Sequence, residues 1–172
     1  GVLGEPMQDV VKHSTQNMTD DDLSAMAGYL KTLPATGNKK ASFTASTATV
    51  DAIMSGDDSQ RGVQLYLDNC SACHRVDGKA SGNVFPALPG NPTVLQQDPS
   101  SLIRVILAGA RLPSTKTAPS ELGMPGFAWR LSDEETAHLT TFVRNAWGNK
   151  AAPVGAADVA KVRKALKDHE IH

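Results

Sequence analysis

The chain has 172 residues, with 17 Lys and Arg against 18 Asp and Glu, which gives a formal net charge of −1. This balance argues against nucleic-acid binding driven by electrostatic attraction. No apolar run in the sequence approaches the roughly 18 residues of a membrane-crossing helix, so we expect membrane association only peripherally or through partners. The chain opens at Gly1 and Val2 without a charged and apolar leader, which predicts a processed or cut product.

The first 33 residues are expected to hold one good helix. Thr19 and the three aspartates that follow it are typical of a helix start. The helix predicted over 19–33 carries an amphipathic stripe of Leu23, Met26, Ala27 and Leu30, in which we expect Met26 to have a core role. Residues 34–58 then form a linker before a domain at residues 59–149.

The sequence Cys70-Ser-Ala-Cys73-His74 contains both cysteines of the chain. A helix is predicted over 60–73, and residues three apart on one helical turn share a face. Two thiols placed in this way can reach the two vinyl groups of one porphyrin, and the next residue can present an imidazole to iron. The motif is typical of covalent haem c attachment.

Two other interpretations of this motif are open from the residues alone. A redox dithiol also uses a C-x-x-C spacing, usually within strand–helix alternation, and we find no such alternation here. A tetrahedral zinc site would need two further ligands at matching spacing, and the sequence offers no second Cys/His pair. Haem c is the interpretation that we favour.

The remaining elements of the domain follow from turn residues and periodicity. Residues 84–92 contain three prolines and a glycine, which predict a rigid loop. A short helix is expected over 101–108, and then a long loop over 110–131. Ser132-Asp-Glu-Glu135 predicts a capping box, and the helix that it begins should run to about Trp147. This last helix mirrors the helix over 19–33 in cap, length and apolar face, so residues 1–33 are expected to be the end of a preceding haem domain. The alternative is that two unrelated amphipathic helices look alike.

Met124 is the methionine predicted to close the second face of the iron. It lies in the long loop, and Pro125 should hold its backbone extended. His/Met ligation gives a six-coordinate iron with a raised potential, which suits electron transfer and leaves no room for substrate.

The domain at residues 59–149 resembles the class I c-type cytochromes. In that family a glycine and an aromatic residue precede the first cysteine, as Gly62 and Tyr66 do here, and the haem-binding helix crosses the last helix at an aliphatic and an aromatic residue, here Leu139 and Phe142. The resemblance implies an all-α cytochrome c fold with an extra N-terminal helical segment. It further implies that the carbonyl of Pro86 orients His74 and that Met124 ligates the iron.

A closer resemblance covers nearly the whole chain. The segments 62–70, 85–91 and 102–107 are similar to the multihaem cytochrome subunit of membrane-bound alcohol, gluconate and aldehyde dehydrogenases. In those subunits a methionine matching Met7 ligates the second haem, so Met7 would have an iron only if another polypeptide supplied it. The first domain and most of the second domain of such a subunit are missing from this sequence.

The resemblance implies a function as an electron-transfer subunit rather than an enzyme. One covalent haem c would pass electrons from a dehydrogenase subunit toward quinone or a terminal oxidase, in the bacterial periplasm. Arg104 and Trp129 are candidate donors to haem propionates, beside a core or surface role for each. Three alternatives stay open: a standalone monohaem carrier, an open-site haem enzyme or sensor, and an interaction module whose residues 1–58 clamp partner subunits.

The last segment, residues 150–172, is predicted to be a basic tail. Within it Lys161, Arg163, Lys164 and Lys167 alternate with apolar residues. A solvated helix explains this pattern, and docking against a dehydrogenase or a membrane surface is the alternative.

Overall fold

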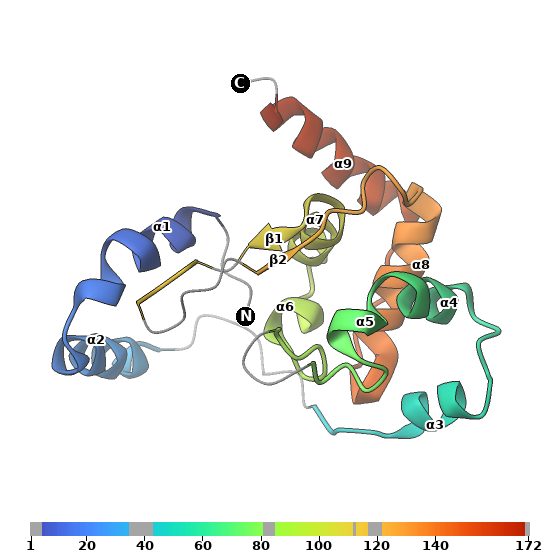
Figure 1. Ribbon diagram of the computed structural model, residues 1–172, viewed down its shortest axis with the longest axis horizontal. Coiled ribbons are helices and arrows are strands. Elements are labelled where there is room, and N and C mark those ends of the chain that lie inside the picture. Colours follow the sequence, from blue (N-terminus) through green and yellow to red (C-terminus); the bar gives the residue numbers. More distant parts are fainter. Residues whose placement is uncertain (1–4, 35–42, 81–84, 112, 117–121, 171–172) are drawn as a thin grey trace. The chain divides into compact units, whose positions relative to one another are not determined.

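The computed structural model describes residues 5–34, 43–80, 85–111, 113–116 and 122–170. These residues are mostly helical, and the described part of the chain contains one small sheet, in which β1 (Ala110–Arg111) pairs with β2 (Gly123–Met124) (Figure 1). The all-α expectation is therefore confirmed. The chain divides into two compact units: residues 41–110 with 124–172, here the motif unit, and residues 2–40 with 111–123, here the N-terminal unit.

The N-terminal unit contains α1 (Glu5–His13), the 3-10 turn η1 (Thr15–Asn17) and α2 (Asp20–Thr32). The predicted start of α2 is confirmed, because the Thr19 hydroxyl accepts from the Asp22 amide and the Asp22 carboxylate accepts from the Thr19 amide. The expected core role of Met26 is wrong for this chain. Its side chain is 45% exposed and α2 buries no residue, so the apolar stripe has no cover among the described residues.

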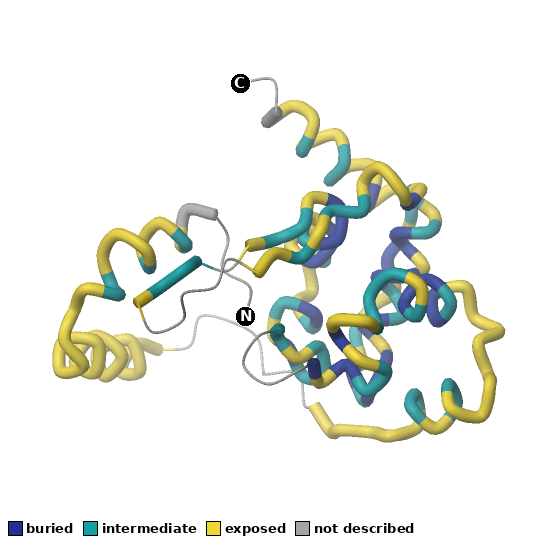
Figure 2. Tube along the Cα trace, viewed as in Figure 1, coloured by how far each residue is buried: buried dark blue, intermediate teal, exposed yellow. Residues whose placement is uncertain are grey.

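The motif unit is built around helices that bury one face each, as the dark segments of Figure 2 show. Helix α4 packs across α8, and α9 packs on both α7 and α8. Residues of α4, α6, α7 and α8 share one core cluster, and α9 closes a second cluster. The elements of this unit are α3 (Ala48–Met54), α4 (Arg61–Asn69), α5 (Ser71–His74), α6 (Pro92–Leu95), α7 (Ser100–Ala108), α8 (Asp133–Asn145), the 3-10 turn η2 (Ala146–Gly148) and α9 (Ala156–Glu170).

The crossing of α4 and α8 depends on Gly62. A Cβ atom at this position would lie 2.6 Å from the His138 carbonyl oxygen and 2.7 Å from the Cβ of Phe142, so only glycine lets the two backbones approach this closely. One turn later Tyr66 is fully buried, with its ring 5.3 Å from that of Phe142. The aromatic and glycine positions that the resemblance assigned to a helix crossing do meet there.

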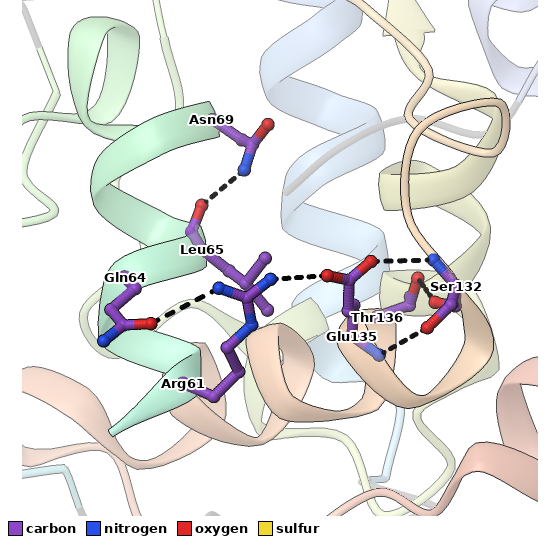
Figure 3. A network of polar contacts seen from close by, with 7 residues as sticks. All are labelled: Arg61, Gln64, Leu65, Asn69, Ser132, Glu135 and Thr136. Atoms are coloured by element: carbon purple, nitrogen blue, oxygen red, sulfur yellow. Dashed lines mark hydrogen bonds and ion pairs between the residues drawn. The ribbon is translucent and has the colours of Figure 1, made fainter. Parts of the chain in front are cut away.

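Polar contacts at one end of the same crossing join the two helices (Figure 3). Arg61 of α4 pairs with Glu135 of α8 at 2.5 Å and also donates to Gln64 at 3.3 Å. Glu135 in turn accepts from the backbone amide of Ser132, whose hydroxyl accepts from the Glu135 amide, which completes the predicted capping box. The first turn of α8 is therefore joined to α4 through Glu135.

The single helix predicted over 60–73 is two helices in the structure. Cys70 leaves the helical region at φ −123° and ψ −33°, and α4 ends there. The carbonyl of Cys70 then accepts from the amides of Cys73 and His74, which starts the separate turn α5. The prediction was wrong at this point because periodicity cannot locate a change of helix axis.

The segments on either side of residues 59–149 also pack within the motif unit. Between residues 34 and 58, the Ser46 amide donates to the Trp147 carbonyl and the Trp147 amide donates to Thr49. The C-terminal helix is confirmed, but it is packed rather than solvated: Val159 is buried, and Arg163 pairs with Asp133 at 2.7 Å. The bounds of the four predicted segments remain predictions.

Candidate haem site

The five residues of the motif form one tight turn. Cys70 ends α4, and α5 carries Cys73 and His74. Both cysteines are free thiols. Cys70 is half-buried, whereas Cys73 is exposed. Arg75 stops the turn in a left-handed conformation with φ 62°. The turn therefore presents two thiols and one imidazole from a single short element.

His74 is buried, and the surroundings of its ring fit an iron ligand. Burial lowers the pKa of the imidazole, which favours the neutral form that metals bind, while the nearby Pro86 carbonyl opposes this shift. Among the described residues, Nδ1 of His74 has no partner within hydrogen-bond geometry. A buried polar nitrogen without a partner is costly, and the nearby Pro86 carbonyl is the acceptor that would satisfy it, which leaves Nε2 of the ring for a metal.

The Cys70 thiol has the electrostatics of a buried group. Burial, and next the neighbouring Cys73, raise its pKa to about 12. Nucleophilic cysteines of redox dithiols have lowered pKa values instead. Burial, with smaller contributions from Cys70 and Asp77, also raises the pKa of Tyr66 far above its usual range. Position 70 is thus a poor setting for a thiolate.

Aromatic side chains hold the loop that follows His74. The hydroxyl of Tyr66 donates to the Arg75 carbonyl at 2.6 Å, and the indole Nε1 of Trp147 donates to the Val76 carbonyl at 2.8 Å. The Trp147 ring also covers Gly78, where a Cβ would lie 3.0 Å from ring carbons. Our reading of the sequence assigned Trp147 no role beyond ending a helix, although a tryptophan next to a glycine at a helix end was a signal for this kind of packing.

The predicted rigid loop around Pro86 is fixed to the same frame. The Leu88 amide donates to the Gly78 carbonyl at 2.9 Å, which joins this loop to the one after His74. The buried Asn149 side chain accepts from the Gly90 amide at 2.8 Å and donates to the Leu88 carbonyl at 3.3 Å. Phe85 lies with its ring centroid 6.4 Å from that of His74. Proline content predicted the loop but not the asparagine that anchors it.

Met124 differs from the other methionines in its surroundings. Met7, Met18, Met26 and Met54 are exposed, whereas Met124 is half-buried and packs against the core cluster that Cys70 also contacts. Its backbone is extended in β2, as predicted from Pro125.

Two glycines let the Met124 segment approach the end of α7. Gly109 has φ 79°, and a Cβ there would collide with the Met124 carbonyl. At Gly126 a Cβ would lie 2.7 Å from the Leu107 carbonyl. The amide of Phe127 then donates to the Ile106 carbonyl at 3.0 Å. Sequence reasoning missed both glycines as positioning residues.

The two predicted propionate donors are exposed. Trp129 is 81% exposed, and its Nε1 donates to the Gly126 carbonyl at 3.1 Å. Arg104 is exposed on α7. Their roles toward a haem, like that of Met7, stay predictions.

A separate groove of about 970 Å³ lies along α3, α4 and α8, and its lining contains none of the predicted haem-contacting side chains. Across the described ranges, no group of three or more His, Cys, Asp and Glu side chains could hold a metal ion, and no helix is long and apolar enough to cross a membrane. The donor set of α5, a buried imidazole beside two free thiols, fits covalent haem c.

Comparisons with known proteins agree with this donor set. Residues 59–147 match the family model described as cytochrome c. The gluconate 2-dehydrogenase cytochrome c subunit of Pantoea cypripedii is 43% identical, over 92% of this chain and 36% of the relative. The cytochrome c subunit of the quinone alcohol dehydrogenase of Gluconobacter oxydans is 44% identical, over 91% of this chain and 33% of the relative. The fructose dehydrogenase cytochrome subunit of Gluconobacter japonicus is 33% identical, over 92% of this chain and 36% of the relative. The chain spans about a third of the length of these relatives.

Proposed function

The chain belongs to the cytochrome c family, and from that premise we propose that it transfers electrons through one haem c. Cys70 and Cys73 would hold the group by thioether bonds, and His74 would ligate the iron. The observation that carries the proposal is the short turn that ends in α5, which places a buried imidazole beside two free thiols. When bound, a haem c supplies a one-electron couple. The chain then serves as an electron carrier rather than as a catalytic subunit.

Met124 would supply the second protein ligand of the iron. It is the half-buried methionine of the five, and two glycine contacts and the hydrogen bond of Phe127 fix its segment on α7. On the other side, the Pro86 carbonyl orients the His74 ring, since it lies close enough to affect the pKa of that ring. Tyr66 supports His74 indirectly by holding the Arg75 carbonyl. Arg104 would supply donors for haem propionates, and Trp129 would do so only by releasing its Nε1 from the Gly126 carbonyl.

The raised pKa of Cys70 weighs against the redox dithiol interpretation. A dithiol oxidoreductase needs a thiolate near neutral pH, and burial disfavours that thiolate here. Thioether formation consumes the thiol and leaves no charge to bury. A half-buried Met124 likewise weighs against an open-site enzyme or sensor.

We further propose that the chain works as part of a dehydrogenase cytochrome subunit. Its relatives are named as cytochrome subunits of gluconate, alcohol and fructose dehydrogenases. The chain would receive electrons from a dehydrogenase subunit and pass them toward quinone or a terminal oxidase. Such chemistry fits the periplasm, with membrane contact peripheral or through partners. A standalone monohaem carrier is the alternative.

Residues 1–33 are proposed as the end of a preceding cytochrome domain, with Met7 as a ligand of that domain's haem. The capping boxes of α2 and α8 and their equal lengths support this. The exposed apolar side chains of α2 are then a face that the haem-binding helix of that domain would cover.

Visible spectra of the purified haem-loaded chain, with a pyridine haemochrome assay, test the proposal. We expect one haem c per chain, low spin, with the weak long-wavelength band of methionine on ferric haem. Met124→Ala should abolish this band and lower the reduction potential, while Met54→Ala, at an exposed methionine, should change neither. A high-spin wild-type spectrum would indicate an open-site protein, and absence of covalent haem would overturn the whole proposal.

A further inference from the structure

Arg163 of α9 holds the turn that follows the Met124 segment. Its Nη1 donates to the Ala128 carbonyl at 2.7 Å, and its Nη2 donates to the Leu131 carbonyl at 2.8 Å. The Nε of the same guanidinium donates to the Asp133 carboxylate at 2.7 Å, and only 19% of the Arg163 side chain is exposed. Three nitrogens of one rigid planar group thus bind one short stretch of chain, a geometry that the single nitrogen of a lysine cannot reproduce.

The other side of the same turn is fixed to α7. The amides of Phe127 and Ala128 donate to two carbonyls at the end of α7, both at 3.0 Å. Within the turn, the Phe127 carbonyl accepts from the Leu131 amide at 3.0 Å. Because α9 itself packs on α7, the turn is held between these two helices.

Met124 lies three residues before Phe127 and shares its packing. Both side chains pack against the core cluster that contains buried Leu131. Pro125 and Gly126 leave the intervening backbone little freedom. The proline ring fixes its own φ, and a Cβ at Gly126 would lie 2.7 Å from a carbonyl of α7. A displacement of the turn would therefore be transmitted to Met124.

We infer that Arg163 is a positioning residue for Met124, so that α9 contributes to the haem site although it lies beyond the residues that match the family. The inference rests on the proposed function, because it takes Met124 as a ligand of the iron. The residues involved all belong to the motif unit. A turn held from two sides samples fewer conformations, so the thioether has a higher effective concentration at the iron. Arg163 thus sets how easily another ligand displaces Met124.

Three variants separate the contacts of the guanidinium. Arg163→Met keeps a long side chain and removes all three donors. Asp133→Asn removes the charge of the ion pair and leaves both hydrogen bonds to the turn carbonyls. Lys164→Met, at the exposed next position of α9, is the control for the loss of a positive charge from this helix.

Imidazole titration of the haem-loaded full chain measures the strength of the methionine–iron bond, because imidazole must displace Met124 to bind the iron. Arg163→Met should tighten apparent imidazole binding by about ten-fold, since the turn loses two charge-assisted hydrogen bonds. Asp133→Asn and Lys164→Met should stay within about two-fold of wild type, because partly exposed charge pairs contribute little. Trypsin cleavage after Arg130, an exposed residue of the turn, should accelerate in Arg163→Met alone.

The outcomes separate this inference from the proposed function. If the wild type lacks the methionine band, the ligation proposal fails and takes the positioning role with it. If the band is present and imidazole binds Arg163→Met as it binds wild type, the positioning role alone is overturned. Faster cleavage after Arg130 without a change in imidazole binding has the same meaning, because Arg163 would then hold the turn without affecting Met124.

Arg163→Lys decides the matter if Arg163→Met loses helix content by circular dichroism. This variant keeps the cation on α9 but offers one donor atom in place of three. We expect it to keep the wild-type helix content and to bind imidazole more tightly than wild type does. Wild-type imidazole binding by Arg163→Lys would then overturn the positioning role.

Discussion

Helices α2 and α8 share their local signals and differ in burial. Each has 13 residues, a capping box and three acidic residues in its first turn. Counted from their caps, Met26 corresponds to Leu139 and Tyr29 to Phe142. Yet Leu139 is fully buried against the core, whereas Met26 and Tyr29 are exposed. Local signals decide that a helix forms, and a partner such as α4 decides whether its apolar face is buried.

The largest expected effect comes from truncating the corresponding apolar side chains of α8 and α2. Leu139→Ala should lower the free energy of unfolding by about 3 kcal/mol, because it empties a fully buried site. Met26→Ala should change it by less than about 0.5 kcal/mol, because the side chain is already solvated. Urea unfolding followed by circular dichroism measures both. Equal losses in the two variants would show that α2 has a partner in this chain after all.

A pair of glycines sharpens the same contrast. Gly62→Ala should destabilise by about 2 kcal/mol, because the new methyl group meets the His138 carbonyl and Phe142. At Gly28 of α2 a Cβ meets nothing within 4 Å, so Gly28→Ala should raise helix stability by about 1 kcal/mol. Thermal unfolding followed at the haem absorption and by far-ultraviolet dichroism reports the two effects. A neutral Gly62→Ala would contradict the close crossing of α4 and α8.

The capping residues come next in size. Ser132→Ala should cost about 1 kcal/mol of the stability of the motif unit, since α8 lies at its centre. Thr19→Ala breaks an equivalent box, but we expect only a loss of α2 helicity, with the unfolding of the motif unit unchanged. Ser132→Thr and Thr19→Ser are the matched controls, since both keep a capping hydroxyl.

Much of the fold could be predicted because its signals are local. The two capping boxes, the proline loop and the C-x-x-C-H turn each depend on a few consecutive residues. Gly62 and Tyr66 were assigned to the helix crossing through the resemblance to c-type cytochromes. The break at Cys70, the anchor Asn149 and the packing of Val159 could not be predicted in this way. Each depends on a partner distant in the sequence, whose presence a hydrophobic pattern cannot reveal.

The smallest expected effect concerns pH and the Arg61–Glu135 pair. The hydrogen bond from Arg61, and next that from the Ser132 amide, lower the pKa of Glu135 below its unfolded value (Figure 3). A carboxyl group with a depressed folded pKa stabilises the fold above its unfolded pKa of about 4.3 and loses that contribution as pH falls through the folded pKa. The melting temperature of wild type should therefore fall as the solution is acidified below about pH 4.5.

Glu135→Gln should make the melting temperature depend less on pH below about pH 4.5, because the side chain at this position no longer titrates. Glu134→Gln changes the same charge one position earlier and keeps both the Arg61 pair and the capping box, so it should retain the wild-type slope. The pair is partly exposed, so added salt should weaken the difference between the two variants. Identical slopes in both variants would mean that the crossing of α4 and α8 is held by Gly62 and its apolar neighbours without help from the ion pair at its end.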